Sequence, residues 1–338
     1  MRKTVEVGRA RDWIPILVRY RDPSPLRSLC ELAVTLVPFV LLWLLTWVSV
    51  SLGYWIGLLL VVPAAAFLVR LFMIQHDCGH GSFFRRRGFN HWLGRAISVM
   101  TLTPYDHWRS THAIHHATSG NLAQRGFGDI DTLTVREYQA RSAWQRLCYR
   151  LYRHPAVLFG IGPLYLFVVQ QRYPAGMMRS GWKPWLSTMA TNLAVATTVA
   201  TLIWLIGFKT FLIIEIPIIA LAASAGVWLF YVQHQFERTF WAKGDAWNLH
   251  EAALNGSSHY DLPPVLRWFT ANIGVHHVHH LCSRIPFYRL RRVLRSHPEL
   301  ISVSRLTLAQ SLHCVRLVLW DERRGRLISF DEAKTLRP

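Results

Sequence analysis

The sequence is poor in cysteine and in acidic residues. Its 338 residues include only five cysteines, an odd number without any Cys-x-x-Cys spacing. A disulfide framework is therefore not expected, and the pattern favours reduced thiols in a protein that faces the cytosol. No signal peptide is expected either, because the first apolar run begins late and is too long for one. Asp and Glu number 19 against 38 Lys and Arg, so the formal net charge is +19.

Long apolar runs almost free of charged residues indicate a membrane protein rather than a soluble basic protein. A soluble protein with such a charge would suggest nucleic-acid binding, but 51% of the residues are hydrophobic. Four runs are long enough to cross a hydrocarbon core of ~30 Å; they cover residues 30–50, 54–74, 185–206 and 211–232. The sequence predicts an all-α membrane protein whose four transmembrane helices form two hairpins.

The positions of the basic residues predict the orientation of these helices. Of the 38 Lys and Arg residues, 36 lie before the first run, between the two pairs or after the last run. The positive-inside rule then places both termini and the long central loop in the cytoplasm. The apolar segment 155–169 is short for a span, and we expect it to be interfacial or re-entrant.

Histidine is concentrated in three clusters that lie outside the four runs. The first is His76-Asp77-Cys78-Gly79-His80, the second contains His112, His115 and His116, and the third contains His276, His279 and His280. Their spacings of three and four residues let each cluster aim its imidazoles at a common point on one helix face. So many imidazoles packed together would repel when protonated and would be costly to bury without partners. We therefore predict that they bind metal.

The absence of Glu-x-x-His pairs limits the kinds of metal site that the sequence can form. None of the nine glutamates has a histidine three residues later, whereas soluble carboxylate di-iron bundles use Glu-x-x-His pairs. Zinc has no redox chemistry, and attack on an unactivated methylene of a lipid requires oxygen activation by iron or copper. More ligands are present than one ion needs, so the clusters predict a histidine-rich site for two ions facing a lipid chain.

The clusters and the paired spans resemble the membrane fatty acid desaturase family from about residue 30 to residue 295. The stretches 76–81 and 108–116 are similar to the first two histidine boxes of the branch that includes plant and cyanobacterial Δ12 (ω-6) acyl desaturases. The stretch 272–280, followed by Ser-Arg-Ile-Pro at 283–286, resembles the third box.

The resemblance implies two iron ions, O2 as co-substrate, and electrons from an external ferredoxin or cytochrome b-type donor. It also implies a ninth ligand upstream of the third box. His234 fits that place, whereas His259, where tyrosine is expected, is left out, and His277 is the non-ligand position of its box. The implied ligands are His76, His80, His112, His115, His116, His234, His276, His279 and His280.

The implied activity is the introduction of a cis double bond into an acyl chain, with a lean toward Δ12 chemistry on acyl lipids. The domain would cover residues 30–295, after a cytoplasmic lead-in (1–29) and before a cytoplasmic tail (296–338), and would carry the boxes in a cytoplasmic helical cap. We expect the protein in a bacterial inner membrane. A hydroxylase or oxygenase of a lipid, alkane or carotenoid is the alternative. A metal transporter is disfavoured, because its ligands should lie inside the spans.

Residues near the clusters receive more ordinary interpretations. Arg85-Arg86-Arg87 is expected to be flanking charge rather than a set of lipid-phosphate contacts. Asp129 and Asp131 are expected to be turn residues rather than partners of a ligand histidine. Four aromatic residues either line an acyl tunnel or pack in the core; they are Phe83, Phe84, Trp108 and Trp268.

Overall fold

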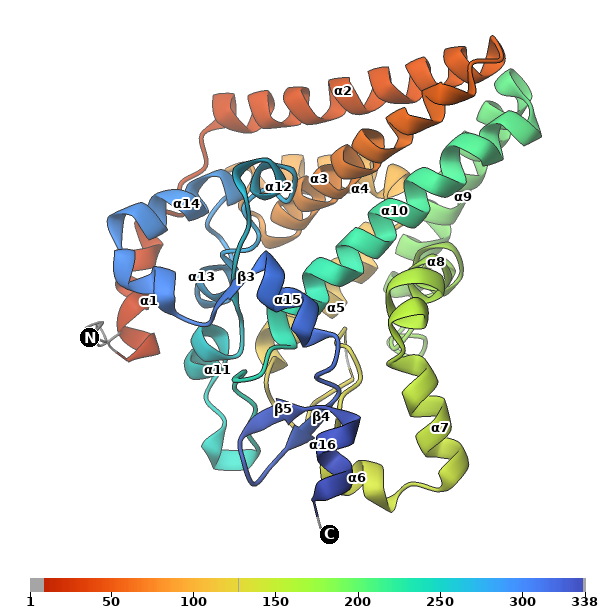
Figure 1. The fold of residues 1–338 in the computed structure, drawn as a ribbon. Helices are drawn as coiled ribbons and strands as arrows, with labels where there is room; N and C mark the ends of the chain where they lie inside the picture. Colours follow the sequence, from red (N-terminus) through yellow and green to blue (C-terminus); the bar gives the residue numbers. More distant parts are fainter. Residues whose placement is uncertain (1–8, 127, 337–338) are drawn as a thin grey trace.

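The structure is a computed structural model that describes residues 9–126 and 128–336, and it is mostly helical (Figure 1). The longer helices are α2 (Pro25–Ser51), α3 (Val61–His80), α4 (Arg87–Met100), α5 (Tyr105–Thr118), α7 (Ala143–Tyr152), α9 (Trp182–Ile206), α10 (Phe208–His234) and α14 (Phe287–Ser296). The shorter ones are α1 (Trp13–Val18), α6 (Val135–Ala140), α8 (Gly162–Leu164), α11 (Leu249–Asn255), α12 (Pro264–Phe269), α13 (His276–Leu281), α15 (Leu308–Cys314) and α16 (Phe330–Thr335).

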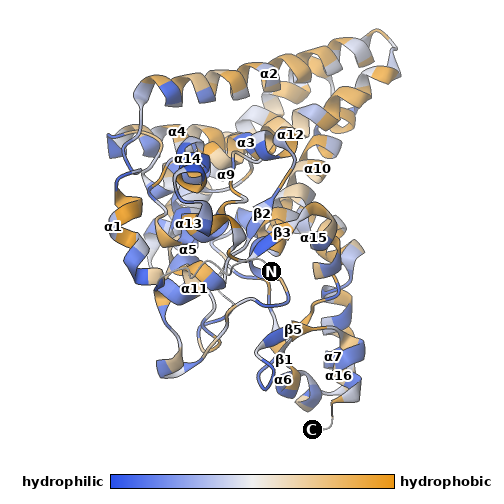
Figure 2. Ribbon diagram, turned by 60° about the vertical axis from the view of Figure 1, so that its left-hand side comes forward, coloured by the Kyte–Doolittle hydropathy of each residue, from blue (hydrophilic) through white to orange (hydrophobic). Residues whose placement is uncertain are grey.

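Four helical segments are long and apolar enough to cross a membrane, as the sequence predicts. They are Pro25–Ser51, Trp55–His80, Trp182–Ile206 and Phe208–His234. Three of them contain a predicted run in full, and the second begins one residue after the predicted start at residue 54. The second segment continues through the first histidine cluster and the fourth ends on His234, so histidines lie on the extensions of these helices. Hydrophobic residues cover α2 and much of α3, whereas α13 and α14 are largely hydrophilic (Figure 2).

The segment predicted to be interfacial is helical but irregular. Two π-helical turns flank α8, and the run Val157–Arg172 is bent by 54° from α7. By length and composition this bent pair passes as a fifth candidate span or as a re-entrant loop.

Two small sheets were not predicted from the sequence. Strands β1 (Leu133–Thr134), β4 (Leu319–Asp321) and β5 (Arg326–Ile328) form one sheet, with β1 parallel and β5 antiparallel to β4. Strands β2 (His259–Asp261) and β3 (Arg305–Thr307) pair in parallel. Buried residues such as Leu300 and Leu306 join the same core as the spanning helices, so the predicted tail region packs on the predicted domain.

A buried arginine ties the first helical hairpin to the third-cluster region. Arg70 of α3 is 1% exposed; it forms an ion pair with Glu31 of α2 and donates to Oγ1 of Thr35 at 3.1 Å. Its guanidinium also donates to the Trp268 carbonyl, and the Cζ atom of Arg70 lies 4.0 Å from the centroid of the Trp268 ring. A buried charge is tolerable only with such partners, so this network fixes α12 against α2 and α3.

Helix α4 packs on α5 through a glycine. A Cβ built on Gly94 would lie 2.2 Å from a ring atom of Tyr105, whose hydroxyl donates to the Cys78 carbonyl at 2.8 Å. The absence of a side chain at Gly94 therefore lets the ring reach the first histidine cluster.

We expect Gly94→Ala to lower the thermal unfolding temperature of the detergent-solubilised protein by several degrees, because the new methyl group displaces the Tyr105 ring. Gly88 lies in the same helix with open space at its Cβ position, so Gly88→Ala is the matched control and should be neutral or slightly stabilising. Equal unfolding temperatures for the two variants would contradict this packing.

Candidate metal centre

Nine buried or half-buried histidines converge from four helices that are far apart in the sequence. They are the nine predicted ligands: His76 and His80 on α3, His112, His115 and His116 on α5, His234 on α10, and His276, His279 and His280 on α13. Their ring nitrogens form two groups, and within each group the ligand atoms lie within 4.8 Å of one another.

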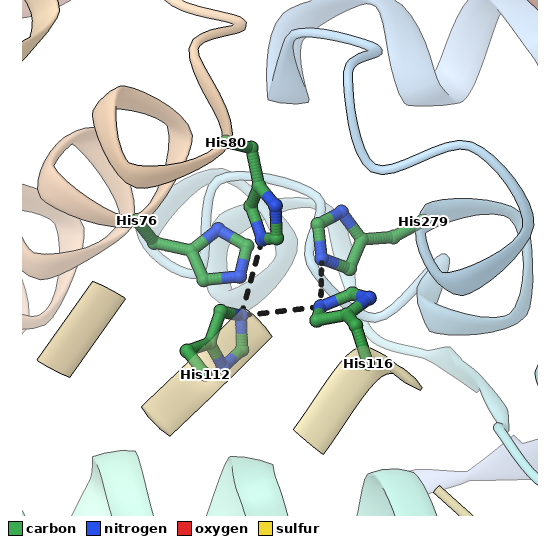
Figure 3. Close-up of side chains that lie close together, drawn as sticks. All are labelled: His76, His80, His112, His116 and His279. Carbon is green, nitrogen blue, oxygen red and sulfur yellow. Dashed lines mark hydrogen bonds between the residues drawn. The ribbon is translucent and has the colours of Figure 1, made fainter. Parts of the chain in front are cut away.

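The five-histidine group brings together all three clusters (Figure 3). Its members are His76, His80, His112, His116 and His279. The Nε2 atom of His112 lies 3.1 Å from Nε2 of His80 and 3.1 Å from Nε2 of His116, which in turn lies 3.2 Å from Nε2 of His279.

The four-histidine group consists of His115, His234, His276 and His280. The Nε2 atom of His234 lies 3.2 Å from that of His115 and 3.0 Å from that of His276. The two groups are adjacent, since the rings of His116 and His280 stack with centroids 4.1 Å apart. The geometry therefore offers two neighbouring sites rather than one.

The expectation that each cluster aims at one common point is correct for the first cluster and wrong for the other two. In the second, His112 and His116 join one group and His115 joins the other. Helix geometry explains the division. At about 100° per residue, positions i and i+4 differ by about 40°, whereas i+3 and i+4 differ by about 100°. The i, i+4 pair thus shares a group, and the third cluster divides in the same way.

The donor set fits metal cations. Burial holds the pKa values of five of these histidines well below the usual range, and neighbouring imidazoles lower them further; these are His112, His116, His276, His279 and His280. They are therefore neutral at pH 7, the form that binds metal. Nitrogens 3.0–3.2 Å apart match adjacent ligands of one ion with bonds of about 2.1 Å, and Nε2 of His280 has no hydrogen-bond partner among the described residues.

Hydrogen bonds on the outer side of the rings fix two of the nine histidines. The Nδ1–H of His115 donates to Oδ1 of Asp129 at 2.5 Å, and the Nδ1–H of His234 donates to the Gly256 carbonyl at 3.1 Å. Both bonds turn Nε2 toward the group and select its lone-pair tautomer. The expectation that Asp129 is only a turn residue is therefore wrong, whereas Asp131 is exposed. In the sequence, the only sign of this contact is an aspartate 13 residues after the last histidine of the second cluster.

The first cluster is shaped for close packing. The Trp108 ring stacks on His112 with centroids 4.7 Å apart, and a Cβ built on Gly79 would lie 2.8 Å from this ring. The glycine between the two histidines thus makes room for the indole. Of the four aromatic residues with two interpretations, Phe83 is packed in the core: it is fully buried and stacks on Phe287.

Asp77, between the same two histidines, connects the first and third clusters. Its carboxylate accepts the backbone N–H of Phe287 at 2.7 Å. Phe287 is the first residue of α14, which follows α13. The aspartate therefore holds the segment that follows the third cluster against the end of α3.

Other histidines lie outside both groups. Nε2 of His277 lies 3.0 Å from the Leu300 carbonyl, and burial lowers its pKa to about 3. His259 donates from Nδ1 to the Ile301 carbonyl at 2.7 Å. His107 is buried on α5 but belongs to neither group. None of the three contributes a ring nitrogen to either group.

Comparison with known proteins identifies relatives over most of the chain. The sequence model of the family described as "Fatty acid desaturase" matches residues 53–310. A fatty acid desaturase of Bacillus subtilis (strain 168) is 43% identical over 315 residues, which cover 93% of this chain and 89% of the relative.

Cyanobacterial relatives are more distant. An sn-1 acyl-lipid omega-3 desaturase (ferredoxin) of Synechocystis is 30% identical over 66% of this chain and 62% of its own length. An sn-1 oleoyl-lipid 12-desaturase of the same organism is 28% identical over 66% of this chain and 63% of its own length.

Asp129 provides a test of the centre that leaves every ligand in place. We expect Asp129→Ala to weaken metal binding about 10- to 100-fold, because His115 loses the acceptor that orients its ring. The metal-to-protein ratio is measured by elemental analysis along a chelator titration. Asp131→Ala, two residues away and exposed, is the control and should retain wild-type metal. Equal retention by the two variants would show that the bond to Asp129 does not support the centre.

Proposed function

The chain belongs to the fatty acid desaturase family of oxidoreductases, and we propose that it introduces a cis double bond at the Δ12 (ω-6) position of an acyl chain in a membrane lipid. The observation that carries this proposal is the convergence of nine histidines into two adjacent groups. Three of them lie at the ends of the apolar helices α3 and α10, and the other six lie on α5 and α13. The Δ12 position is supported by the form of the histidine boxes and by the oleoyl-lipid 12-desaturases among the relatives.

We assign two iron ions to the two groups, with the nine histidines as ligands. The ions would supply oxidation of C–H bonds by O2. In the balanced reaction two hydrogens leave neighbouring methylenes, an external donor supplies two electrons, two protons are taken up, and O2 becomes two waters. The electron donor in this proposal is a ferredoxin or a cytochrome b-type protein. An acidic donor would be attracted to this strongly basic protein by electrostatic steering.

The contribution of the protein is positioning and exclusion of water. Trp108, stacked on His112, and the outer hydrogen bonds of His115 and His234 hold the rings before substrate arrives, and a preorganised site lowers the cost of aligning one C–C bond. Burial of the histidines removes water that would intercept the oxidant. In this assignment residues 30–295 form the desaturase domain, with cytoplasmic segments 1–29 and 296–338.

Fatty-acid profiling tests the activity. A bacterial host without desaturases, supplied with a ferredoxin system, expresses the chain beside His112→Ala. We expect a new unsaturated acid with its double bond at Δ12 from the wild type, and a loss of at least 100-fold in the variant because one group loses a ligand. His313→Ala, at an exposed residue outside both groups, is the control and should retain activity. A hydroxylated product would favour the oxygenase alternative, and a bond elsewhere would overturn the Δ12 assignment.

We also propose that the protein lies in a bacterial inner membrane with its termini and histidine groups on the cytoplasmic side. The support is the distribution of basic residues, because the tips of both hairpins carry almost none. This orientation would bring the centre to the side where soluble electron donors are found.

Cysteine labelling tests the orientation. Single cysteines replace Leu52, at the tip of the first hairpin, and Arg323, in the exposed turn between β4 and β5, in a Cys30→Ser, Cys148→Ser background. A membrane-impermeant maleimide should modify Leu52→Cys in intact spheroplasts and Arg323→Cys only in inverted vesicles. Labelling of both from one side would contradict the two-hairpin topology.

A further inference from the structure

A cavity lined by arginines lies where the first helical hairpin meets the histidine centre. Its volume is about 510 Å³, within the range of small-molecule sites. The lining comes from three separate stretches of chain: the end of α1 with the loop to α2, the loop between α3 and α4, and the loop between α13 and α14. Arg19, Arg21, Arg85 and Arg284 line it, with Asp22 as the one acidic residue.

Most of this positive charge is not neutralised by the protein. Arg85 and Asp22 lie 3.5 Å apart, and both are largely exposed. Arg19, Arg21 and Arg284 form no ion pair with any carboxylate that the structure describes. Four arginines line one cavity, and arginine is the side chain that binds phosphate through paired hydrogen bonds.

The cavity adjoins the centre through the residues that continue two histidine clusters. Gly81, in its wall, directly follows His80 and ends α3 in a left-handed conformation with φ of 65°. Arg21 donates from Nε to Sγ of Cys282 at 3.1 Å, and Cys282 stands two residues after His280. A group bound in the cavity therefore lies beside the segments that hold both metal groups.

The position of the cavity at the polar end of the first hairpin favours the phosphate of a phospholipid over a free phosphate. Helix α2 begins at Pro25 and α3 ends at His80, so both polar ends of this hairpin lie together. The Ser28 hydroxyl confirms this by donating to the Phe83 carbonyl at 2.6 Å. If the two helices cross the membrane, this end lies at the membrane surface, where the phosphates of phospholipids lie and from which their acyl chains run inward.

We propose that this cavity binds the phosphodiester of a glycerophospholipid and so selects phospholipid acyl chains as the substrate of the proposed desaturase. The proposal revises the expectation for the Arg85-Arg86-Arg87 run, because only Arg85 lines the cavity. The role of the cavity in substrate selection rests on the proposed function, whereas the binding of a phosphodiester there does not.

Binding is measured first on the full-length protein in detergent, by isothermal titration. The probes are dioctanoyl-phosphatidylglycerol, dioctanoylglycerol, octanoyl-CoA and inorganic phosphate. We expect the phospholipid to bind at least about tenfold more tightly than each of the others. Equal affinity for dioctanoylglycerol would overturn phosphate recognition, and equal or tighter binding of octanoyl-CoA or of phosphate alone would overturn the assignment to a phospholipid.

Variants locate the binding. Arg19→Gln/Arg284→Gln should raise the Kd for dioctanoyl-phosphatidylglycerol by about 10- to 100-fold, since two charge-assisted contacts are lost, and should leave the affinity for dioctanoylglycerol unchanged. Arg86→Gln/Arg87→Gln removes the same charge beside the cavity and should bind like wild type. Equal losses in the two double variants would show non-specific attraction and overturn the site. Unfolding temperature and metal content of each variant verify that the fold is intact.

Activity then separates this site from the proposed function. With phospholipid substrate, Arg19→Gln/Arg284→Gln should raise KM about tenfold or more with little change in kcat, and diacylglycerol substrate should show no such difference. An active enzyme whose KM is unchanged by the variant overturns the site. A chain that desaturates nothing but retains the binding difference overturns the proposed function and leaves the phosphodiester site standing.

Discussion

The cost of burying nine imidazoles side by side is the constraint on which the rest of this structure depends. Protonated, they would repel one another; neutral, they crowd lone pairs and N–H groups into a space with little water. Cations placed between them remove both penalties. These histidines come from four helices, α3, α5, α10 and α13; the first of them ends at His80 and the last begins at His276. With metal bound, the centre would act as a crosslink among segments that local sequence alone would not hold together.

The residues around the rings show how such a crosslink is kept in shape. Asp129 and the Gly256 carbonyl orient two ligands from outside, and Trp108 covers a third through the space that Gly79 leaves. Asp77 holds the start of α14, and Arg70 holds α12. These contacts come from loops and helix ends as well as from the spanning helices. Residues outside the two histidine groups therefore determine where these histidines stand.

Much of this arrangement was accessible from the sequence, because hydrophobic runs and histidine spacing are local signals. The four apolar helices and the three histidine clusters were predicted from them, whereas His234 was added from the family resemblance. The structure brings all nine histidines together. Which histidines share a group was not predicted, since the clusters were treated as single faces although His115 and His116 point about 100° apart. Asp129 was missed because its partner lies across a loop. The strands are two or three residues long and leave no periodic pattern to recognise.

The continuity of α3 and α10 from apolar segment to ligand has one more consequence. A continuous helix transmits rotation, so a single residue inserted between the apolar part of α3 and His76 would turn both of its ligands by about 100° and shift them by about 1.5 Å. The same insertion at the far tip, near Gly53, would change only a turn. Length variation among related chains should therefore accumulate at the hairpin tips and be excluded from the stretch just before each ligand. The length of each of these helices is therefore constrained at the end that carries histidines and free at the hairpin tip.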